Sequence, residues 1–394
     1  MPKITGYETH DVRFPTSLTG DGTDAMNTDC DYSSAYVTLL TDSDLVGHGM
    51  TFTIGRGNDI VCTTIKAVAD RLVGKDTEEL FGNMGKAWDH LVADPQLRWV
   101  GPEKGVIHIA TGAVNNALWD MFASLKVEAP LEAHRRLHPC IYPAYVTSAG
   151  WLGYSDEKIS PHGFNHFKMK TTSAAGKLIR SLIDDPTLLP EGVSPRDPES
   201  DDLKGKNAGP TGSCLAEIKP WFIEEPTAPD DILGHATIRK ALKSSNIGVA
   251  TGEHAHNRMV FKQLLQADAV DVAQIDSCRL AGVTEVLSVL LMAAKFGTIV
   301  CPHAGGVGLC EYVIHLRYVQ RSPVPPCNME RNVLEYVDHL HEHFYTPCSI
   351  NARGRYNVPS NPSEGYSIEM KKESIAEFEW PNGTYWQGRR KSEA

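Results

Sequence analysis

Four acidic or histidine side chains follow short apolar segments in the second half of the chain. Their types suit proton transfer assisted by a metal ion, and the intervals between them are 29, 23 and 27 residues, each about one strand plus one helix. In a barrel of such units the ends of successive strands surround one mouth, where active sites lie. The spacing therefore predicts that these side chains share a site. They are Glu224, Glu253, Asp276 and His303.

Glu224 and Glu253 are candidate ligands of a divalent cation. Mg²⁺ prefers a few carboxylate oxygens in near-octahedral geometry and leaves positions open for substrate. A glutamate after a single strand more often belongs to a solvated loop, and the run 224–226 alone would support that simpler interpretation. Because several consecutive apolar segments end in Lys, Glu, Glu, Asp and His, we favour a metal site over chance.

Asp276 and His303 predict a carboxylate–imidazole pair. The aspartate would fix the imidazole tautomer and raise its basicity. A lone histidine at a strand end is more often structural. The glycines that follow His303, at 305, 306 and 308, favour a backbone that approaches a ligand closely.

Lys168 and Lys170 stand two residues apart in the apolar segment 166–170. On a strand, both side chains lie on one face. Adjacent ammonium groups disfavour each other's charge, which prepares one of them to act as a general base. The alternative is a pair of surface lysines on an edge strand.

Three alternating histidines, His339, His341 and His343, resemble a metal cluster. On a helix or a strand the three rings would not converge on one point. We therefore interpret them as polar residues packed at the rim of the barrel.

The elements that must position these residues fall into two groups. Residues 1–55 are rich in strand formers, with a strand expected at 33–40, and apolar residues at helical spacing predict helices over 61–72 and 110–121. From residue 142 onward, apolar strands alternate with helix-like stretches such as 283–291, which predicts a parallel sheet. A doubly wound sheet is the alternative, weakened because no Gly-x-Gly-x-x-Gly turn follows the first strands. The expected strands are 143–148, 166–170, 221–226, 247–253, 270–276 and 298–303.

Composition narrows the class of partner. The 394 residues carry a net charge of −11, which argues against nucleic acid as the main ligand but permits a small anionic substrate. No apolar run is long enough to span a membrane, and the N-terminus lacks a signal peptide, so we expect a cytoplasmic protein. The nine cysteines contain no Cys-x-x-Cys pair, so neither a zinc knuckle nor a disulfide framework is expected.

With these residues in view, the chain resembles the acid-sugar dehydratases of the mandelate racemase-like branch of the enolase superfamily. The similar segments extend over most of the chain. They are 13–18, 47–53, 97–105, 150–155, 221–235, 252–303 and 334–339.

The resemblance implies an α/β fold of enolase type. An α+β capping domain would occupy residues 1–135, with the C-terminal tail 350–394 packed back on it. A modified (β/α)₇β barrel would occupy 136–349. The stretches 156–219 and 315–332 depart from the barrel pattern because proline- and glycine-rich segments replace regular elements there.

The resemblance also implies roles for individual residues. Lys170 would remove the C2 proton while Lys168 polarises the substrate carboxylate. Glu224 and Glu253 would bind Mg²⁺. His303, paired with Asp276, would protonate the departing C3 hydroxyl. Glu335 would hydrogen-bond the enediolate, and the loop 14–32 would close over the sugar.

The family takes a further metal ligand from an Asp-Ala-Asn motif that this sequence lacks. Asp197 lies nearest the expected position and is a weak candidate. The implied reaction is Mg²⁺-dependent dehydration of a six-carbon aldonate, L-galactonate or L-fuconate, to the 2-keto-3-deoxy acid. One alternative is an impaired pseudoenzyme that binds a ligand or partner. A second is a sugar-acid racemase or epimerase, with Lys170 and His303 on opposite faces of C2. Assembly into a homo-oligomer is a further expectation.

Overall fold

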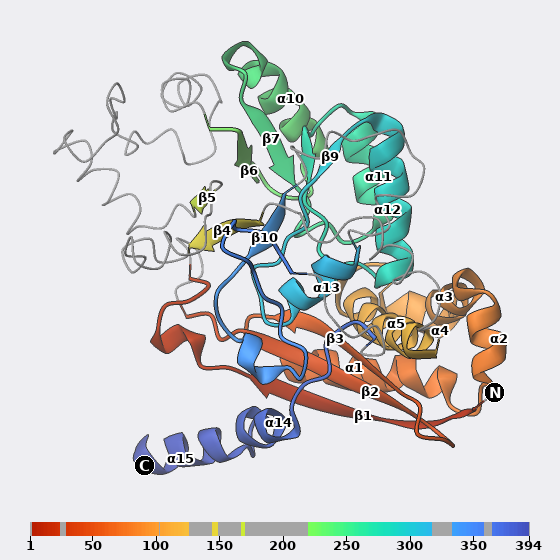
Figure 1. Cartoon of the computed structure of the whole chain (residues 1–394). Coiled ribbons are helices and arrows are strands. Elements are labelled where there is room, and N and C mark those ends of the chain that lie inside the picture. The colour runs from red at the N-terminus through yellow and green to blue at the C-terminus, as the bar shows by residue number, and fades with distance from the viewer. Residues whose placement is uncertain are drawn as a thin grey trace.

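A computed structural model describes most of the chain outside its middle third (Figure 1). Its N-terminal part contains an antiparallel sheet in which β1 (Ile4–Arg13), β2 (Ser33–Thr41) and β3 (Val46–Thr53) lie in that order. The predicted strand 33–40 is thereby confirmed. The described residues are 2–23, 29–101, 103–125, 144–148, 167–169, 220–316, 333–357 and 365–393.

Helices α1 (Asn58–Ala69) and α5 (Gly105–Leu125) cover this sheet and confirm both predicted helices. Helix α5 lies so close to β3 that a Cβ on Gly49 would stand 2.1 Å from the carbonyl oxygen of Ala113. Only glycine permits that approach. Apolar side chains of both helices and of β2, among them Val37, Ile65 and Ala117, form one buried core.

Three short helices, α2 (Thr77–Gly82), α3 (Met84–Val92) and α4 (Pro95–Val100), connect α1 to α5. Each begins after an Asp or Asn whose side chain accepts a backbone N–H of the first turn, the usual reason for a helix to start there.

Parallel strands form the second part. In one sheet β6 (Phe222–Glu224), β7 (Gly248–Thr251), β8 (Val272–Ala273) and β9 (Ile299–Val300) lie in sequence order. In the other, β10 (Leu334–Tyr336) pairs with β4 (Ala144–Ser148), which pairs with β5 (Phe167–Met169). Because the last described strand pairs with the first of this part, the arrangement is that of a closing barrel and not of an open doubly wound sheet.

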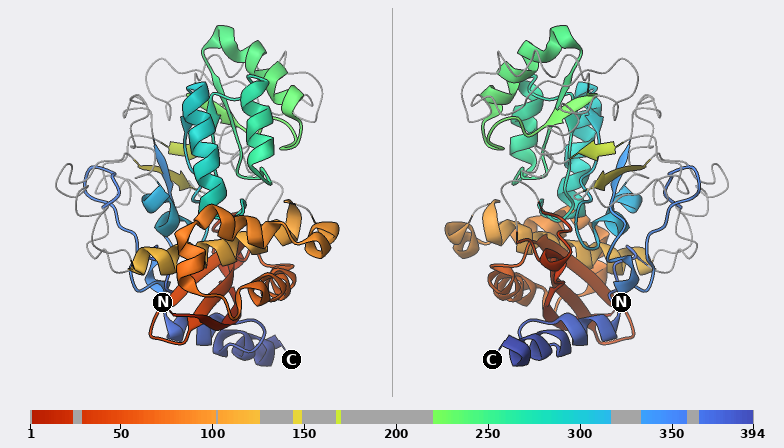
Figure 2. Two further views of the ribbon diagram at one scale, coloured as in Figure 1. Left: turned by 90° about the vertical axis from the view of Figure 1, so that its right-hand side faces the viewer. Right: turned by 90° about the vertical axis from the view of Figure 1, so that its left-hand side faces the viewer.

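Helices α10 (Ile232–Leu242), α11 (Arg258–Gln266) and α12 (Val283–Phe296) lie outside these strands, and the shorter α13 (Leu309–Leu316) follows β9 (Figures 1 and 2). Side chains of β7 that face outward pack against α10, as Val249 does against Leu242. Within the described part of the chain, no helix combines the length and apolar character that crossing a bilayer requires.

The C-terminal helices α14 (Lys372–Phe378) and α15 (Thr384–Glu393) lie along β1, at the end of the molecule away from the barrel helices (Figure 1). The backbone N–H of Trp380 donates to Asp11 O at 2.7 Å, and the Arg13 guanidinium stands 4.9 Å from the centroid of the Trp380 ring. The expected domain boundary near residue 135 falls outside the described residues and stays a prediction.

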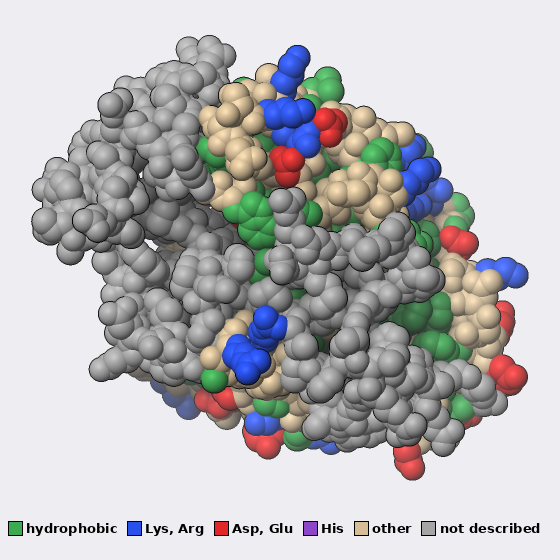
Figure 3. All heavy atoms as spheres, turned by 45° about the horizontal axis from the view of Figure 1, so that its top comes forward, with side chains coloured by type: hydrophobic (Ala, Val, Ile, Leu, Met, Phe, Trp, Pro, Cys, Tyr) green, Lys and Arg blue, Asp and Glu red, His purple; other side chains and the backbone are tan. Residues whose placement is uncertain are grey.

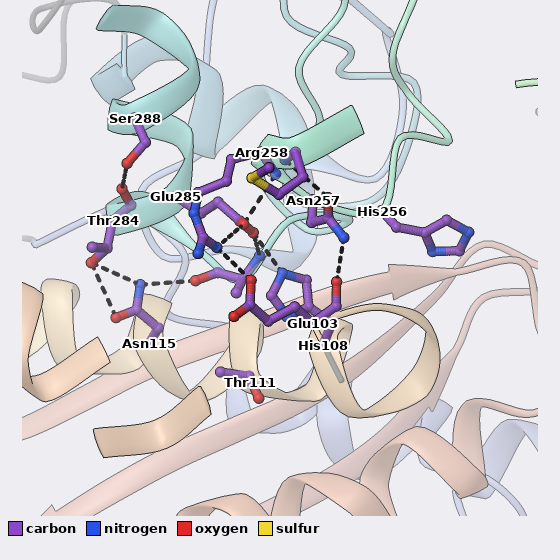
Figure 4. A network of polar contacts seen from close by, with 12 residues as sticks. Glu103, His108, Thr111, Asn115, His256, Asn257, Arg258, Thr284, Glu285 and Ser288 are labelled. Atoms are coloured by element: carbon purple, nitrogen blue, oxygen red, sulfur yellow. Dashed lines mark hydrogen bonds and ion pairs between the residues drawn. The ribbon is translucent and has the colours of Figure 1, made fainter. Parts of the chain in front are cut away.

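The two parts meet through buried polar groups on α5, α11 and α12 (Figure 4). One Glu285 oxygen lies 2.6 Å from His108 Nε2, and the other accepts from Arg258 Nη1 at 2.9 Å. The Arg258 guanidinium also covers the Trp88 ring. A buried carboxylate is stable only with such partners, so this junction fixes how the two parts sit.

The visible surface mixes charges of both signs. Figure 3 shows Lys and Arg side chains beside Asp and Glu on the described surface of one face, without a continuous basic patch there. This distribution is in keeping with a chain that is acidic overall.

Candidate active site

The strands of the barrel place the candidate residues by simple alternation. Ala250, Val272, Cys301 and Val333 form an apolar cluster inside the strands, and Phe222 packs against it. Side chains two positions apart in a strand point to the same side. The residues two positions after members of this cluster therefore extend toward the same space. They include Glu224, Gln274, His303 and Glu335.

Asp276 and His303 form the pair that the sequence suggests. His303 Nδ1 lies 2.8 Å from Asp276 Oδ2, and both side chains are buried. The other aspartate oxygen accepts the backbone N–H groups of Cys278 and Arg279 at 2.6 and 3.0 Å. Because a carboxylate only accepts, Nδ1 carries a hydrogen, and the imidazole is fixed with Nε2 facing the other way.

His303 Nε2 faces two further carboxylates. Glu253 Oε2 lies 3.6 Å away and Glu335 Oε2 lies 3.8 Å away. The backbone N–H of Ala304 donates to Glu335 Oε2 at 2.7 Å, which holds that side chain in place. Burial by itself lowers the pKa of His303, but the charges of Glu253, Glu335 and Asp276 outweigh it and raise the pKa to about 9. The imidazole is thus equipped to hold and donate a proton.

Two carboxylates and one imidazole lie next to the His303–Asp276 pair, just after β6 and β7. Single ligand atoms of Glu225, Glu253 and His254 all lie within 4.8 Å of one another, and Glu225 Oε2 is 3.0 Å from His254 Nδ1. Gly252, with φ of 138°, turns the backbone after β7 so that Glu253 reaches this group. Two carboxylates, with the remaining positions left to substrate and water, suit the coordination of Mg²⁺.

In the structure, Glu225 and not Glu224 lies with Glu253 in this group. The sequence predicts Glu224 and Glu253 as ligands, and Glu224 does end β6, opposite Ala250. The side chain gathered with Glu253 is that of Glu225, a residue in the left-handed region with φ of 44°. Both glutamates therefore remain candidates.

Gln274 is a further candidate site residue that the sequence pattern does not single out. Its side chain is fully buried, and neither amide atom has a hydrogen-bond partner among the described residues. A buried polar group without partners is costly, and near an active site it points to a ligand. Its position could have indicated this, because Gln274 lies two residues before Asp276 in the expected strand 270–276.

Three predicted site residues cannot be placed as side chains. Lys170 and Asp197 lie outside the described residues. Lys168 is in β5, where its backbone pairs with Thr147, and only that backbone position is described. Their roles stay predictions.

The capping part reaches the site through aromatic rings. Tyr32, at the end of the loop 14–32, contacts Phe52 edge to face, with ring centroids 5.0 Å apart. Phe52 in turn lies directly beside Gly306, three residues after His303. Tyr32 also lies 5.6 Å from His339, measured between ring centroids. The C-terminal end of this loop is thus close to the site.

The three alternating histidines do not share a ligand position. His339 stands against Tyr32, and His343 Nδ1 lies 3.0 Å from Ser374 Oγ. His341 bonds with Glu311 and with the carbonyl of Val337. This divergence agrees with the interpretation of the three as rim residues.

Comparison with known proteins decides the family. A family model described as enolase C-terminal domain-like matches residues 156–374. L-galactonate dehydratase of Hypocrea jecorina is 45% identical over 444 positions, which cover 97% of this chain and 96% of the relative. The chain belongs to the enolase superfamily. Human mitochondrial enolase superfamily member 1 is 43% identical over 98% of this chain and 97% of the relative.

Solved structures agree with this assignment and with the barrel-plus-cap fold. The crystal structure of human mitochondrial enolase superfamily member 1 has a TM-score of 0.84, 42% identity and 98% coverage of both chains. L-talarate dehydratase from Polaromonas, solved with Mg and L-glucarate, has a TM-score of 0.67 at 19% identity and covers 95% of this chain and 97% of its own. At that identity it supports the fold alone.

The alignment with the Hypocrea relative is longer than the chain itself, at 444 positions against 394 residues. The superfamily relative therefore carries internal segments that this chain lacks.

Proposed function

We propose that this superfamily member is a Mg²⁺-dependent dehydratase of a six-carbon aldonate, L-galactonate or L-fuconate, and forms the 2-keto-3-deoxy acid. The observation that supports this most directly is the His303–Asp276 pair, in which His303 Nε2 faces Glu253 and Glu335. The names of the relatives support the class of substrate: L-galactonate dehydratase at 45% identity, and arabinonate dehydratase at 26%.

Magnesium, when bound, would neutralise the substrate carboxylate and so acidify the proton on the neighbouring carbon. Glu225 and Glu253, whose carboxylates cluster after β6 and β7, are the residues that would hold it, with Glu224 at the end of β6 as the further candidate that the sequence predicts. The donor set is all hard oxygen apart from His254, as Mg²⁺ prefers.

The protein's own groups then move two protons. Lys170 would take the proton from C2, with Lys168 beside the carboxylate. His303 would give the proton on Nε2 to the C3 hydroxyl, so that the C3–O bond breaks and water leaves. The resulting enol becomes the 2-keto acid when C3 gains a proton and the hydroxyl on C2 loses one. Glu335, fixed by the Ala304 N–H, would accept a hydrogen bond from the enediolic oxygen when it is protonated.

The geometry favours His303 as the acid. Asp276 holds the Nδ1 hydrogen, and three carboxylates surround the ring, so the positively charged imidazolium is the stabilised form. A histidine that must accept the C2 proton, as a racemase requires, would need the neutral form.

The test is an assay of purified protein with Mg²⁺ and a panel of acid sugars, in which 2-keto acids are measured. We expect product from L-galactonate or L-fuconate, and its loss in Lys170→Met. If no aldonate yields a 2-keto acid and Mg²⁺ binds only weakly, the pseudoenzyme alternative holds instead. The missing Asp-Ala-Asn motif is the specific observation in favour of that alternative.

A further inference from the structure

A second cluster of metal-ligand side chains lies beside the active site, and the proposed reaction does not use it. Cys310 is near the start of α13, His341 opens a short 3₁₀ helix after β10, and Cys348 follows in the next loop. One ligand atom from each lies within 4.8 Å of the other two. The Cys348 sulfur is 3.4 Å from His341 Nδ1.

The histidine ring is held as a zinc-bound histidine is held. His341 Nε2 lies 2.7 Å from the carbonyl oxygen of Val337, so Nε2 donates and the ring cannot turn. Nδ1 consequently faces Glu311 Oε1, 2.8 Å away, and the two cysteines. Outer hydrogen bonds of this kind, from the non-ligating nitrogen to a backbone carbonyl, are typical of metal sites.

Glu311 supplies an independent indication. Its side chain is almost fully buried, and Oε1 contacts both His341 Nδ1 at 2.8 Å and the backbone N–H of Cys348 at 3.1 Å. The other oxygen, Oε2, is also buried and has no hydrogen-bond partner among the described residues. A buried carboxylate oxygen without a partner is costly, and the positive charge of a cation in the neighbouring cluster would reduce that cost.

We propose that Cys310, His341 and Cys348 bind Zn²⁺ or a similar thiophilic divalent cation. Thiolate and imidazole ligands select zinc over magnesium, which prefers oxygen. With Zn–S of about 2.3 Å and Zn–N of about 2.0 Å, tetrahedral geometry places sulfur and nitrogen about 3.5 Å apart. The 3.4 Å between Cys348 Sγ and His341 Nδ1 matches that separation.

The cation would stabilise the floor of the active site. Cys310 Sγ lies 3.6 Å from the carbonyl oxygen of Ala304, whose N–H holds Glu335. The hydroxyl of Tyr356 donates to the backbone carbonyl of Glu335. Zinc in this cluster would thus join α13 and the loop after β10 to the segment that carries His303, so metal loading raises the Tm.

The experiment measures metal retention. The whole protein is reduced, stripped of metal, loaded with Zn²⁺ in excess Mg²⁺ that occupies the carboxylate site, dialysed, and analysed for zinc. We expect one zinc per chain. Cys348→Ser should lose it, and Cys62→Ser, which removes a thiol from the capping part, should keep it. Loading with Co²⁺ should give a thiolate-to-metal charge-transfer band in the wild type and in Cys62→Ser, but not in Cys348→Ser.

Two results would overturn the proposal. They are a wild-type protein that retains no zinc, and a Cys348→Ser variant that retains as much as the wild type. If Cys348→Ser fails to fold, the Co²⁺ spectrum of the wild type decides, because a band without thiolate character excludes the cysteines.

Discussion

At the scale of single residues, His303 owes its proposed role to neighbours on three different strands or loops. Asp276 orients the ring, while Glu253 and Glu335 stand 3.6 and 3.8 Å from its free nitrogen. None of these contacts is local in sequence. The barrel brings them together because each lies at or just beyond the same end of a strand in the parallel sheet.

Gly305 tests how tightly that nitrogen is positioned. A Cβ added at Gly305 would lie 2.9 Å from His303 Nε2, closer than unbonded atoms rest, and Asp276 prevents the ring from turning away. Gly305→Ala should lower kcat about tenfold to a hundredfold, since small misplacements of a reacting group have such effects. Steady-state kinetics measure the change.

Gly388→Ala is the matched control, because an added Cβ there meets nothing within 4 Å. It should leave kcat and KM unchanged. If Gly305→Ala retains full activity, Nε2 of His303 is not the proton donor in the arrangement described.

At the scale of elements, the strand ends were predictable and the turns between them were not. The intervals between Glu224, Glu253, Asp276 and His303 reflect a repeated strand–helix unit, which sequence periodicity reveals. That Glu225 joins Glu253 depends on a left-handed backbone at Glu225, which no pattern indicates.

The zinc-ligand cluster was out of reach of the sequence for a similar reason. Cys310 and Cys348 belong to different elements, and their sulfurs meet only because α13 packs against the loop after β10. The expectation that the histidines at 339–343 form no common site was sound, but it said nothing about what His341 meets elsewhere in the fold.

The junction between α5, α11 and α12 predicts a large stability effect. Glu285 is fully buried and accepts from Arg258, from the backbone N–H of Ala281 and from His108. Removing it leaves His108 and the backbone N–H of Ala281 buried without this partner, while Arg258 keeps its ion pair with Glu103. Glu285→Ala should therefore lower the free energy of unfolding by roughly 3 to 5 kcal/mol, measured by urea denaturation.

Asp268→Asn serves as the comparison. Asp268 pairs with Arg239 at the surface, where its side chain is 83% exposed, and such pairs contribute about 0 to 1 kcal/mol. Equal losses in both variants would show that the buried junction does not hold the capping part to the barrel.

At the scale of the whole molecule, two buried histidines each predict a loss of stability in mild acid, while buried Asp120, whose pKa burial raises from 3.8 to about 7, opposes that loss. Burial lowers the pKa of both His48 and His315 from 6.5 to about 4. Between these values the unfolded chain binds protons that the folded chain excludes. This contribution to stability is complete above pH 6.5 and is lost as the pH falls toward 4.

His315→Gln isolates one of these groups. His315 Nε2 lies 3.0 Å from Ser367 Oγ, a contact that a glutamine amide can replace. Urea denaturation at pH 7 and at pH 5 gives the free energy of unfolding at each pH. The difference between the two values should be smaller in the variant than in the wild type, by about 1 to 2 kcal/mol. An unchanged pH dependence would show that His315 is protonated in the folded chain.

Resemblance over the whole chain predicts the superfamily but not the substrate. Similar segments spread over most of the sequence indicated the enolase superfamily, and the 45% identical relative confirms it. Substrate choice stays a prediction, because no sequence pattern identifies the positions of the capping loop 14–32 that are expected to contact the sugar. The cytoplasmic location and the homo-oligomer likewise stay predictions.

The most direct test of the central claim is proton NMR of L-galactonate and L-fuconate with Mg²⁺ in D₂O, with the wild type and His303→Asn. We predict that the wild type forms the 2-keto-3-deoxy acid. The variant should lose product formation by about 10² to 10⁴-fold, as expected for a lost general acid, and still exchange the C2 proton for deuterium. Product at the wild-type rate from His303→Asn, or C2 exchange without product in the wild type, would contradict the account.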